Sequence, residues 1–293
     1  MLIVATCAIA LTACGSSDKS TSSTTTQTQS QTGGGADQKV AALVPAAIKQ
    51  KGSLKVAADA TYAPNEFLAA DGKTVEGMDA DLAEAIAKVM GLKADVVNAT
   101  FDAIIPGLAA HKYDLGMSSF TDTKEREKTV DFVTYFSAGT SFYVKDGGPN
   151  IQTLDNICGE KVAVEKGTTQ ADDVTAQAKK CKAAGKPEPK LQTFPDQNGA
   201  NLAISSGRAD VGMADSPVAA YQVKKSGGQF KLSGKPYGTA PYGIAIPKDA
   251  GMTKAVLAAV KAVMANGSYD QILKKWGIQS GAIKEPAINA AVS

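Results

Sequence analysis

The chain has 293 residues, with 31 basic and 29 acidic side chains and a formal net charge of +2. A chain of this length is long for one hydrophobic core, so two lobes are expected. No basic run longer than a pair is interleaved with aromatic residues, which argues against nucleic acid as a partner. With one histidine and no Cys-x-x-Cys pair, the sequence predicts neither a metal site nor a cofactor.

The N-terminus has the features of a targeting signal. Residues 1–13 are apolar and uncharged, and the run Leu11-Thr12-Ala13-Cys14-Gly15 resembles a lipobox, in which cleavage leaves Cys14 to carry a lipid. The apolar run is too short to span a membrane as a mature helix. No Lys or Arg precedes it, which a start codon assigned too late would explain. The alternative is a chance cysteine after an apolar stretch.

Residues 14–39 are rich in Ser, Thr, Gln and Gly. Such a segment buries too little apolar surface to offset the entropy lost on ordering. We expect a disordered tether with a root-mean-square reach of about 25–30 Å. With a lipid on Cys14, it would hold an extracytoplasmic domain at the cell membrane; the alternative is a disordered tail without an anchoring role.

Further along the chain, predicted strands alternate with predicted helices. Strands are expected at 54–58, 94–97, 115–117, 162–164, 192–194, 211–213 and 244–247, with an extended segment at 139–144. Helices are expected at 79–90, 101–110, 170–183, 198–206, 217–224 and 252–276. A loop is expected at 59–65. The alternation predicts α/β lobes with mostly parallel central sheets.

Several motifs occur in the order and spacing of a known family. They are Gly77–Ala87, Phe101–Leu108, Lys112–Asp114, Thr121–Arg126 with Val130–Phe132, Lys161–Gln170, Gly207–Asp215, Gly243–Lys248 and Gly267–Gly277. Over residues 52–278 the chain resembles the bacterial extracellular solute-binding proteins of family 3, which bind polar amino acids for ABC transporters.

The resemblance implies a periplasmic-binding-protein-like type II fold, in which a two-strand hinge joins two α/β lobes. Lobe 1 would comprise 40–139 and 240–293, and lobe 2 would comprise 140–239, with crossings near 139–142 and 239–243. It also implies a monomeric binding protein, not an enzyme, that delivers a free amino acid to a membrane permease with ATPase subunits. The chain itself has no Gly-x-x-x-x-Gly-Lys-Ser/Thr loop, so it should not hydrolyse nucleotide.

The stretch 114–126 ends a predicted strand in a polar loop and places Arg126 just beyond it. The planar guanidinium can hold a carboxylate through two parallel hydrogen bonds. Hydroxyl and backbone groups that can surround a polar ligand come from Ser118, Ser119 and Thr121. The alternative is a surface arginine in a turn where Thr121 or Thr123 caps a helix, and the resemblance favours the ligand site.

Other candidate ligand groups follow strands later in the chain. Thr168 and Thr169 open a predicted helix, whose free amides favour an anion, and helix capping uses the same geometry. Asp215 would meet the ligand ammonium, although an isolated Asp before Ser-Pro is more often an N-cap. Tyr62 and Phe101 resemble the two aromatic walls of the family, and either could instead be a core residue.

Two carboxylates, Asp59 and Glu165, stand at positions that line the pocket in the family. In a closed cleft they would repel a ligand carboxylate and favour a cation or an amide donor. We therefore expect arginine, lysine or glutamine rather than glutamate or aspartate. Lys166 could neutralise Glu165, and Asn65 replaces an aromatic residue that the family generally carries.

Cysteine counting leaves one pair in the mature protein. Cys7 lies in the predicted leader and Cys14 would carry the lipid, so Cys158 and Cys181 remain. In an exported protein this pair predicts a disulfide. It would close a loop of about 24 residues and add about 3 kcal/mol of stability.

Two other functions are compatible with the same fold. A cyclohexadienyl dehydratase-like enzyme would use Glu165 or Asp59 as a general acid. A sensor subunit would present its ligand to a signalling receptor. A Ser-His-Asp hydrolase has little support, because it would have to recruit His111, which we expect in an exposed turn.

Overall fold

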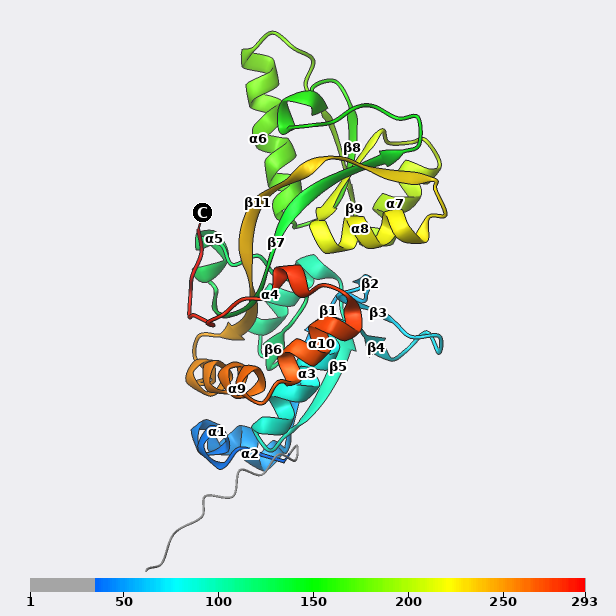
Figure 1. Ribbon diagram of the computed structural model, residues 1–293. Helices are drawn as coiled ribbons and strands as arrows, with labels where there is room; N and C mark the ends of the chain where they lie inside the picture. Colours follow the sequence, from blue (N-terminus) through cyan, green and yellow to red (C-terminus); the bar gives the residue numbers. More distant parts are fainter. Residues whose placement is uncertain (1–34, 293) are drawn as a thin grey trace, which may run out of the picture. The chain divides into compact units, whose positions relative to one another are not determined.

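The structure is a computed structural model that describes residues 35–292 (Figure 1). The predicted signal peptide, Cys14 and residues 14–34 of the predicted tether lie outside the described residues. Helix α1 (Gln38–Leu43) was not predicted: it begins two residues before the predicted end of the disordered tether, because the Asp37 carboxylate caps its first amides. Between residues 35 and 292, no helix has the length and apolar character needed to cross a membrane.

Eight strands form one mixed sheet in the order β5-β1-β6-β11-β7-β10-β8-β9. Their bounds are β1 (Ser53–Ala58), β5 (Lys93–Asn98), β6 (Leu115–Gly116), β7 (Val130–Lys145), β8 (Lys161–Glu165), β9 (Lys190–Phe194), β10 (Val211–Asp215) and β11 (Phe230–Pro247). The outer pairs are parallel, but β7 and β11 run antiparallel to each other and to their outer neighbours. The prediction of mostly parallel sheets is therefore wrong in the centre, because hydrophobic periodicity does not report strand direction.

The two central strands belong to both halves of the sheet. Strands β7 and β11 are paired from Val130↔Pro247 to Lys145↔Phe230, and in Figure 1 they run between the lower and upper groups of elements. Their register shifts between Ser233 and Gly243. Such irregularities interrupt the ladder and allow a bend. On β11 the shifts at Tyr237/Ala240 and Tyr242/Gly243 overlap the predicted crossing at 239–243, and the shift at Ser233/Tyr237 lies before it.

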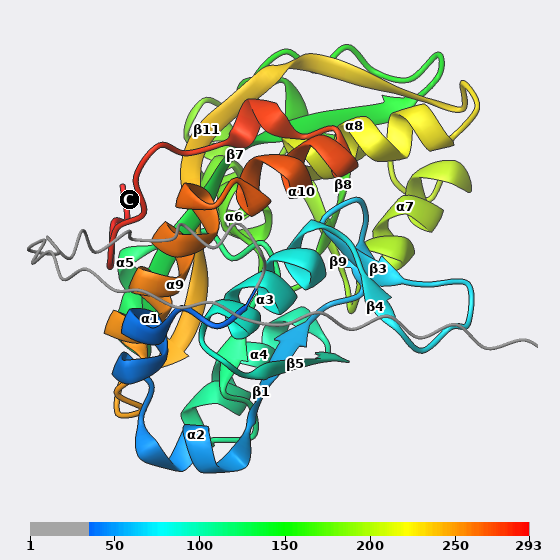
Figure 2. The same cartoon turned by 60° about the horizontal axis from the view of Figure 1, so that its bottom comes forward.

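The β1 side of the sheet is covered by helices α3 (Met78–Val89), α4 (Phe101–Ala109), α9 (Thr253–Ala265) and α10 (Ser268–Trp276). Helix α3 buries Leu82 and Ile86, which are four residues apart and so lie on one face. Helices α1 and α2 (Ala46–Lys51) complete this side, with α1 beside α9 (Figure 2). The expected single helix 252–276 is two helices, because Gly267 at φ 79° interrupts it.

The β8 side has its own core. Helices α6 (Thr169–Ala183), α7 (Gln197–Ser205) and α8 (Ser216–Lys225) and the 3₁₀ turn η1 (Leu154–Ile157) surround it. Its buried side chains include Val164, Val174 and Met213. Gly212 has a packing reason, since a Cβ there would lie 2.2 Å from the Tyr143 ring.

A small antiparallel sheet lies beside the β1 half. Its strands are β2 (Thr61–Tyr62), β3 (Glu66–Leu68) and β4 (Val75–Glu76). The sequence predicted a loop at 59–65, because a strand of two residues shows no alternation. This sheet places Tyr62 and Glu66 close to the cavity described below.

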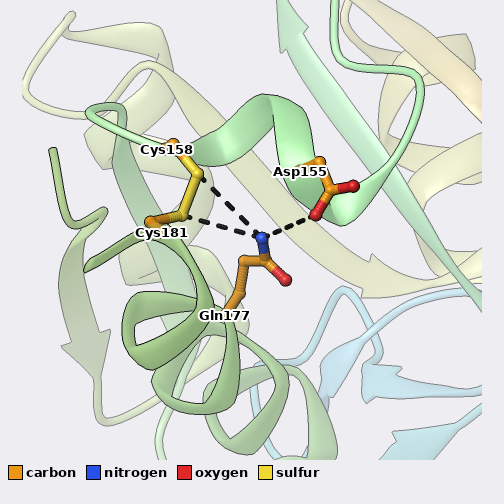
Figure 3. Close-up of a disulfide and its surroundings, with 4 residues drawn as sticks. All are labelled: Asp155, Cys158, Gln177 and Cys181. Atoms are coloured by element: carbon orange, nitrogen blue, oxygen red, sulfur yellow. Dashed lines mark hydrogen bonds between the residues drawn. A yellow bond between two sulfur atoms is a disulfide. The ribbon is translucent and has the colours of Figure 1, made fainter. Parts of the chain in front are cut away.

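The predicted disulfide between Cys158 and Cys181 is confirmed, with the two Cα atoms 5.7 Å apart. It joins the end of η1 to the last turn of α6. The buried Gln177 amide donates a hydrogen bond to Asp155 Oδ1 at 2.9 Å and lies 3.6 Å from Cys181 Sγ (Figure 3). The bridge is therefore at the opposite end of α6 from Thr169.

Replacing both cysteines by alanine should lower the free energy of unfolding by about 3 kcal/mol, because the unfolded chain regains loop entropy. Urea unfolding of the oxidised parent and of the double variant measures the difference. Ligand affinity should be unchanged, since the bridge lies away from the start of α6. An unchanged urea midpoint would contradict this prediction.

Candidate ligand-binding site

All eleven residues predicted to bind the ligand line one cavity. They are Asp59, Tyr62, Phe101, Ser118, Ser119, Thr121, Arg126, Glu165, Thr168, Thr169 and Asp215, and Gln170 completes the lining. The residues come from both halves of the sheet, the half that contains β1 and the half that contains β8. Their segments follow β1, β6, β8 and β10, so the carboxyl ends of strands build this cavity.

Arg126 lies on the four-residue helix α5 (Lys124–Glu127). The Thr123 hydroxyl caps this helix by accepting the Arg126 N–H at 3.2 Å, so the predicted capping turn is present. The guanidinium donates from Nη1 to the Thr121 carbonyl and from Nη2 to the Gly167 carbonyl, each at 2.9 Å. Since Gly167 follows β8, one side chain connects the two halves.

Two stacked aromatic rings support the guanidinium. Arg126 Cζ lies 5.3 Å from the Phe101 ring centroid and 5.4 Å from that of Phe120, and these rings are 4.5 Å apart. Burial lowers the pKa of Arg126 to about 10, and the nearby Asp215 opposes this shift. Arg126 therefore remains a cation at neutral pH, held over apolar faces that also attract it.

Asp215 ends β10 and directly precedes α8. Its side chain makes no capping hydrogen bond to that helix, so the N-cap alternative fails for the carboxylate. Instead it accepts hydrogen bonds from the Tyr242 hydroxyl at 2.6 Å and from Gln170 Nε2 at 2.8 Å. Burial raises the pKa of Asp215, while these two donors favour the charged form.

Tyr62 lines the cavity from β2 and is not only a core residue. Its hydroxyl accepts the Asp215 backbone N–H at 2.9 Å. Gln170 was not among the predicted residues. Its position could have indicated a role, because Gln170 directly follows the threonine pair that opens α6. In the structure its amide donates a hydrogen bond to Asp215.

Glu165, the last residue of β8, is 2% exposed and its Oε1 has no hydrogen-bond partner among the described residues. Burial, and then the charge of Asp59, raise the pKa of Glu165 to about 10. Asp59 has donors, since its carboxylate accepts the Phe101 N–H at 3.0 Å and the Thr61 hydroxyl at 2.6 Å. The cavity therefore contains a protonated acid beside a hydrogen-bonded one.

The expected neutralisation of Glu165 by Lys166 is wrong. Lys166 Nζ lies 2.7 Å from Asp102 Oδ2 of helix α4. Lys166 lies in the turn after β8 and pairs outside the cavity, whereas Glu165, the last residue of the strand, lines the cavity. The Lys166–Asp102 pair instead connects the β8 side to α4.

The start of α6 is arranged for an anion. The Thr168 side chain accepts the Ala171 N–H at 3.3 Å and donates to the Glu165 carbonyl at 2.8 Å. Thr169 begins the helix. The first amides of a helix carry a partial positive charge, which suits a carboxylate beside Arg126.

Sequence reasoning missed two buried acids, Glu66 and Asp79, which contact the cavity residues Ser118 and Ser119. Ser118 Oγ donates to Glu66 Oε1 at 3.0 Å and accepts the Asp59 N–H at 2.9 Å. The Ser119 N–H donates to Asp79 Oδ2 at 2.7 Å, which holds Ser119 at φ 51°. The pair therefore fixes the loop that carries both serines.

Burial raises the pKa of Asp79 to about 6 and raises that of Glu66 well above its ordinary range. The Tyr135 hydroxyl also donates to Asp79, at 2.7 Å. Asn65, noted as a departure from the family, is fully buried and its Nδ2 donates to Ser119 Oγ at 2.9 Å, so it supports the same loop.

Two α/β lobes that share a pair of crossing strands, with a polar cavity at strand ends, define a hinged binding protein. Residues 54–279 match the model of the bacterial extracellular solute-binding proteins, family 3. The chain belongs to this family. Solute-binding proteins of this family are extracytoplasmic.

Several known proteins are similar to this chain. The arginine-binding protein ArgT of Corynebacterium glutamicum is 34% identical over 252 residues, which are 86% of this chain and 83% of that protein. The ABC transporter glutamine-binding protein GlnH of Bacillus subtilis is 34% identical over 208 residues, 69% of this chain and 72% of that protein. These named relatives are binding proteins rather than enzymes.

Among solved structures, an ancestral arginine-binding protein bound to arginine is similar to the chain with a TM-score of 0.72 and 35% identity, covering 77% of this chain and 98% of that one. This likeness confirms the type II two-lobe fold predicted from the sequence. The family motifs quoted from the sequence fall within residues 54–279, the range that matches the family model.

Glu165→Gln should reduce the loss of stability at alkaline pH. Because the folded-state pKa of Glu165 is raised from 4.5 to about 10, the folded chain binds more protons than the unfolded chain within that window. The free energy of unfolding therefore falls as pH rises from about 4.5 to about 10.

The measurement is urea unfolding from pH 5 to 9, without added amino acid, for the parent, Glu165→Gln and the exposed control Glu76→Gln. The advantage of Glu165→Gln over the parent should increase with pH, and Glu76→Gln should follow the parent. A pH-independent difference between parent and Glu165→Gln would contradict the assignment.

Proposed function

We propose that this protein captures a free polar or basic amino acid, arginine first, between its two lobes and delivers it to an ABC permease. The observation that carries the proposal is one buried cavity lined by a cation, Arg126, and by an anion, Asp215. A free amino acid is a zwitterion, so Arg126 would hold its carboxylate and Asp215 its ammonium. The start of α6 adds amides to the carboxylate side.

The acids Asp59 and Glu165 support a ligand with nitrogen donors on its side chain. The unpartnered Glu165 Oε1 is a buried acceptor, and an N–H from the ligand would satisfy it. A guanidinium would supply such donors and would also favour ionisation of both acids. The named relatives include an arginine-binding and a glutamine-binding protein, so glutamine is the next candidate and lysine the third.

Contacts between the two sides support coupling of binding to closure. The Gln197 N–H donates to Thr61 Oγ1 at 3.1 Å, the Asp215 N–H donates to Tyr62, and Arg126 donates to Gly167. A ligand that touches both sides stabilises this arrangement by its differential contacts. A permease with ATPase subunits would then recognise the closed form.

The remaining parts of the proposal concern location and assembly. The lipobox and the tether support a lipid on Cys14 that anchors the chain at the extracytoplasmic face of a membrane. The protein would act as a monomer and bind no nucleic acid. The lobe limits 40–139 with 240–293, and 140–239, stand as part of the same proposal.

One observation favours a second candidate, a dehydratase-like reaction. Burial raises the pKa of Glu165 to about 10, so at neutral pH it carries the proton that a general acid needs. Asp215, placed for an ammonium, and the binding activity named for the relatives favour transport. Incubation with prephenate separates the two, because turnover would support the enzyme and its absence with amino-acid binding would support the transporter.

Arg126→Ala should abolish the thermal shift caused by every amino acid, because the carboxylate common to all of them loses its partner. At a hundredfold excess over Kd, a ligand adds about 2.7 kcal/mol to the stability of the parent. A thermal-shift screen of the common amino acids measures this. The exposed Arg208→Ala is the matched control and should respond like the parent; a normal response from Arg126→Ala would exclude the clamp.

Asp59→Asn and Glu165→Gln should change the preference among side chains. Each should weaken arginine binding by about tenfold or more, because a buried carboxylate partner of the guanidinium is lost. Glutamine binding should change less, because an amide carbonyl still accepts its N–H. Calorimetric titration of both ligands into each variant measures the ratio, and equal losses for arginine and glutamine would argue against this assignment.

A further inference from the structure

The last described segment of the chain, residues 282–292, lies beyond the part that matches the family. The match ends at residue 279, within the 3₁₀ turn η2 (Gln279–Gly281). From η2 the segment runs back along the molecule, and in Figures 1 and 2 its end lies beside α5. Helix α5 carries Arg126, so the segment reaches the part of the chain that presents the guanidinium.

The middle of the segment pairs with an edge of β7. Ala287 accepts the Thr134 N–H at 2.9 Å and donates its own N–H to Thr134 Oγ1 at 2.8 Å. The Asn289 N–H donates to the Phe132 carbonyl at 3.0 Å, and Asn289 Oδ1 accepts the Phe132 N–H at 2.8 Å. Strand β10 pairs with β7 only from Thr140 to Val144, so the segment takes the place of a neighbouring strand at 132–134.

The end of the segment reaches two acids of the 121–127 loop, Asp122 and Glu127. The Ala290 N–H donates to Asp122 Oδ2 at 2.7 Å, and the Ala291 N–H donates to Glu127 Oε1 at 3.2 Å. Asp122 is fully buried and lies next to Thr121, whose carbonyl accepts from Arg126. Two backbone amides of the C-terminal segment thus hold both ends of the short loop and helix that present the guanidinium.

These donors matter because α5 has little support of its own. It is four residues long and none of its side chains is buried in a core. Burial raises the pKa of Asp122 to about 6, and the nearby Glu127 adds to the shift. An acid that loses its donor in such a site costs free energy, and the loop would move to regain one. A displaced loop would carry Arg126 away from the ligand carboxylate.

We propose that residues 287–291 form a positioning strap, which fixes the 121–127 loop and thereby sets the affinity of the Arg126 clamp. The strap does not touch the ligand. The proposal rests on the proposed function, in which Arg126 holds the carboxylate of an amino acid. It adds a determinant of affinity that lies outside the region shared with the family.

The test compares two truncations of the otherwise full chain. A stop after Pro286 removes the strap but keeps the buried Pro286, whereas a stop after Ala291 keeps every strap contact. Calorimetry with arginine and glutamine should show about tenfold weaker binding for the first truncation only. Equal affinity of the two truncations would overturn the proposal.

A double-mutant cycle separates positioning from general destabilisation. If the strap acts through the guanidinium, its removal should cost little in an Arg126→Lys background, where the forked contact is already lost. A synthetic peptide of residues 284–293 should also restore affinity to the strapless chain. Additive losses in the cycle would contradict action through Arg126.

A further readout does not depend on the ligand. Amide hydrogen exchange at residues 121–127 should rise on truncation after Pro286, while exchange in β8 should stay unchanged. If the full chain binds neither arginine nor glutamine, the proposed function fails, and this exchange still decides whether the strap holds the loop. If the truncated chain does not fold, Asn289→Ala replaces it, and unchanged exchange there overturns the proposal.

Discussion

The site depends on the burial of one charge, the guanidinium of Arg126. A buried cation costs free energy unless its N–H donors are paired. Two N–H donors of Arg126 bind the carbonyls of Thr121 and Gly167, which belong to opposite halves of the sheet. Phe101 and Phe120 exclude water from one face. The remaining donor capacity of the planar fork faces the cavity, where an anionic group would complete its hydrogen bonds. In the proposed function, that group is the carboxylate of the amino acid.

Two acids of the cavity, Asp215 and Glu165, bear on the other groups of the proposed ligand. Asp215 accepts hydrogen bonds from Tyr242 and Gln170, which favour its charged form against the effect of burial. Glu165 lacks a donor and keeps its proton. A ligand with an ammonium beside its carboxylate suits the first acid, and one with a further cation or amide suits the second. In the proposed function, the charges that line the cavity would therefore select the ligand class.

Sequence reasoning found the cavity residues because each one follows a strand within a local motif. Asp215 and Glu165 follow the predicted strands at 211–213 and 162–164, and a short run of residues suffices to place them. It missed the acid pair Glu66 and Asp79, which meet only in the folded chain and support Ser118 and Ser119 from below. Pairing in space also explains the Lys166 error, since the lysine meets Asp102 of a distant helix. The break at Gly267 was missed because helical periodicity continues on both sides of it.

Strand β7 connects the determinants of the site. Its residues 132–134 pair with the C-terminal segment, and its residues near 138–140 lie where the register of the crossing strands is irregular. In the proposed function a bend at the second point would move the lobes, whereas the first point belongs to the half of the sheet that carries Arg126. Contacts at 132–134 would then hold the proposed clamp in place while the hinge changes. In this proposed arrangement, the positioning of Arg126 for a carboxylate is separate from closure of the lobes. The segment after residue 279 would then change affinity without changing the motion that a permease would recognise.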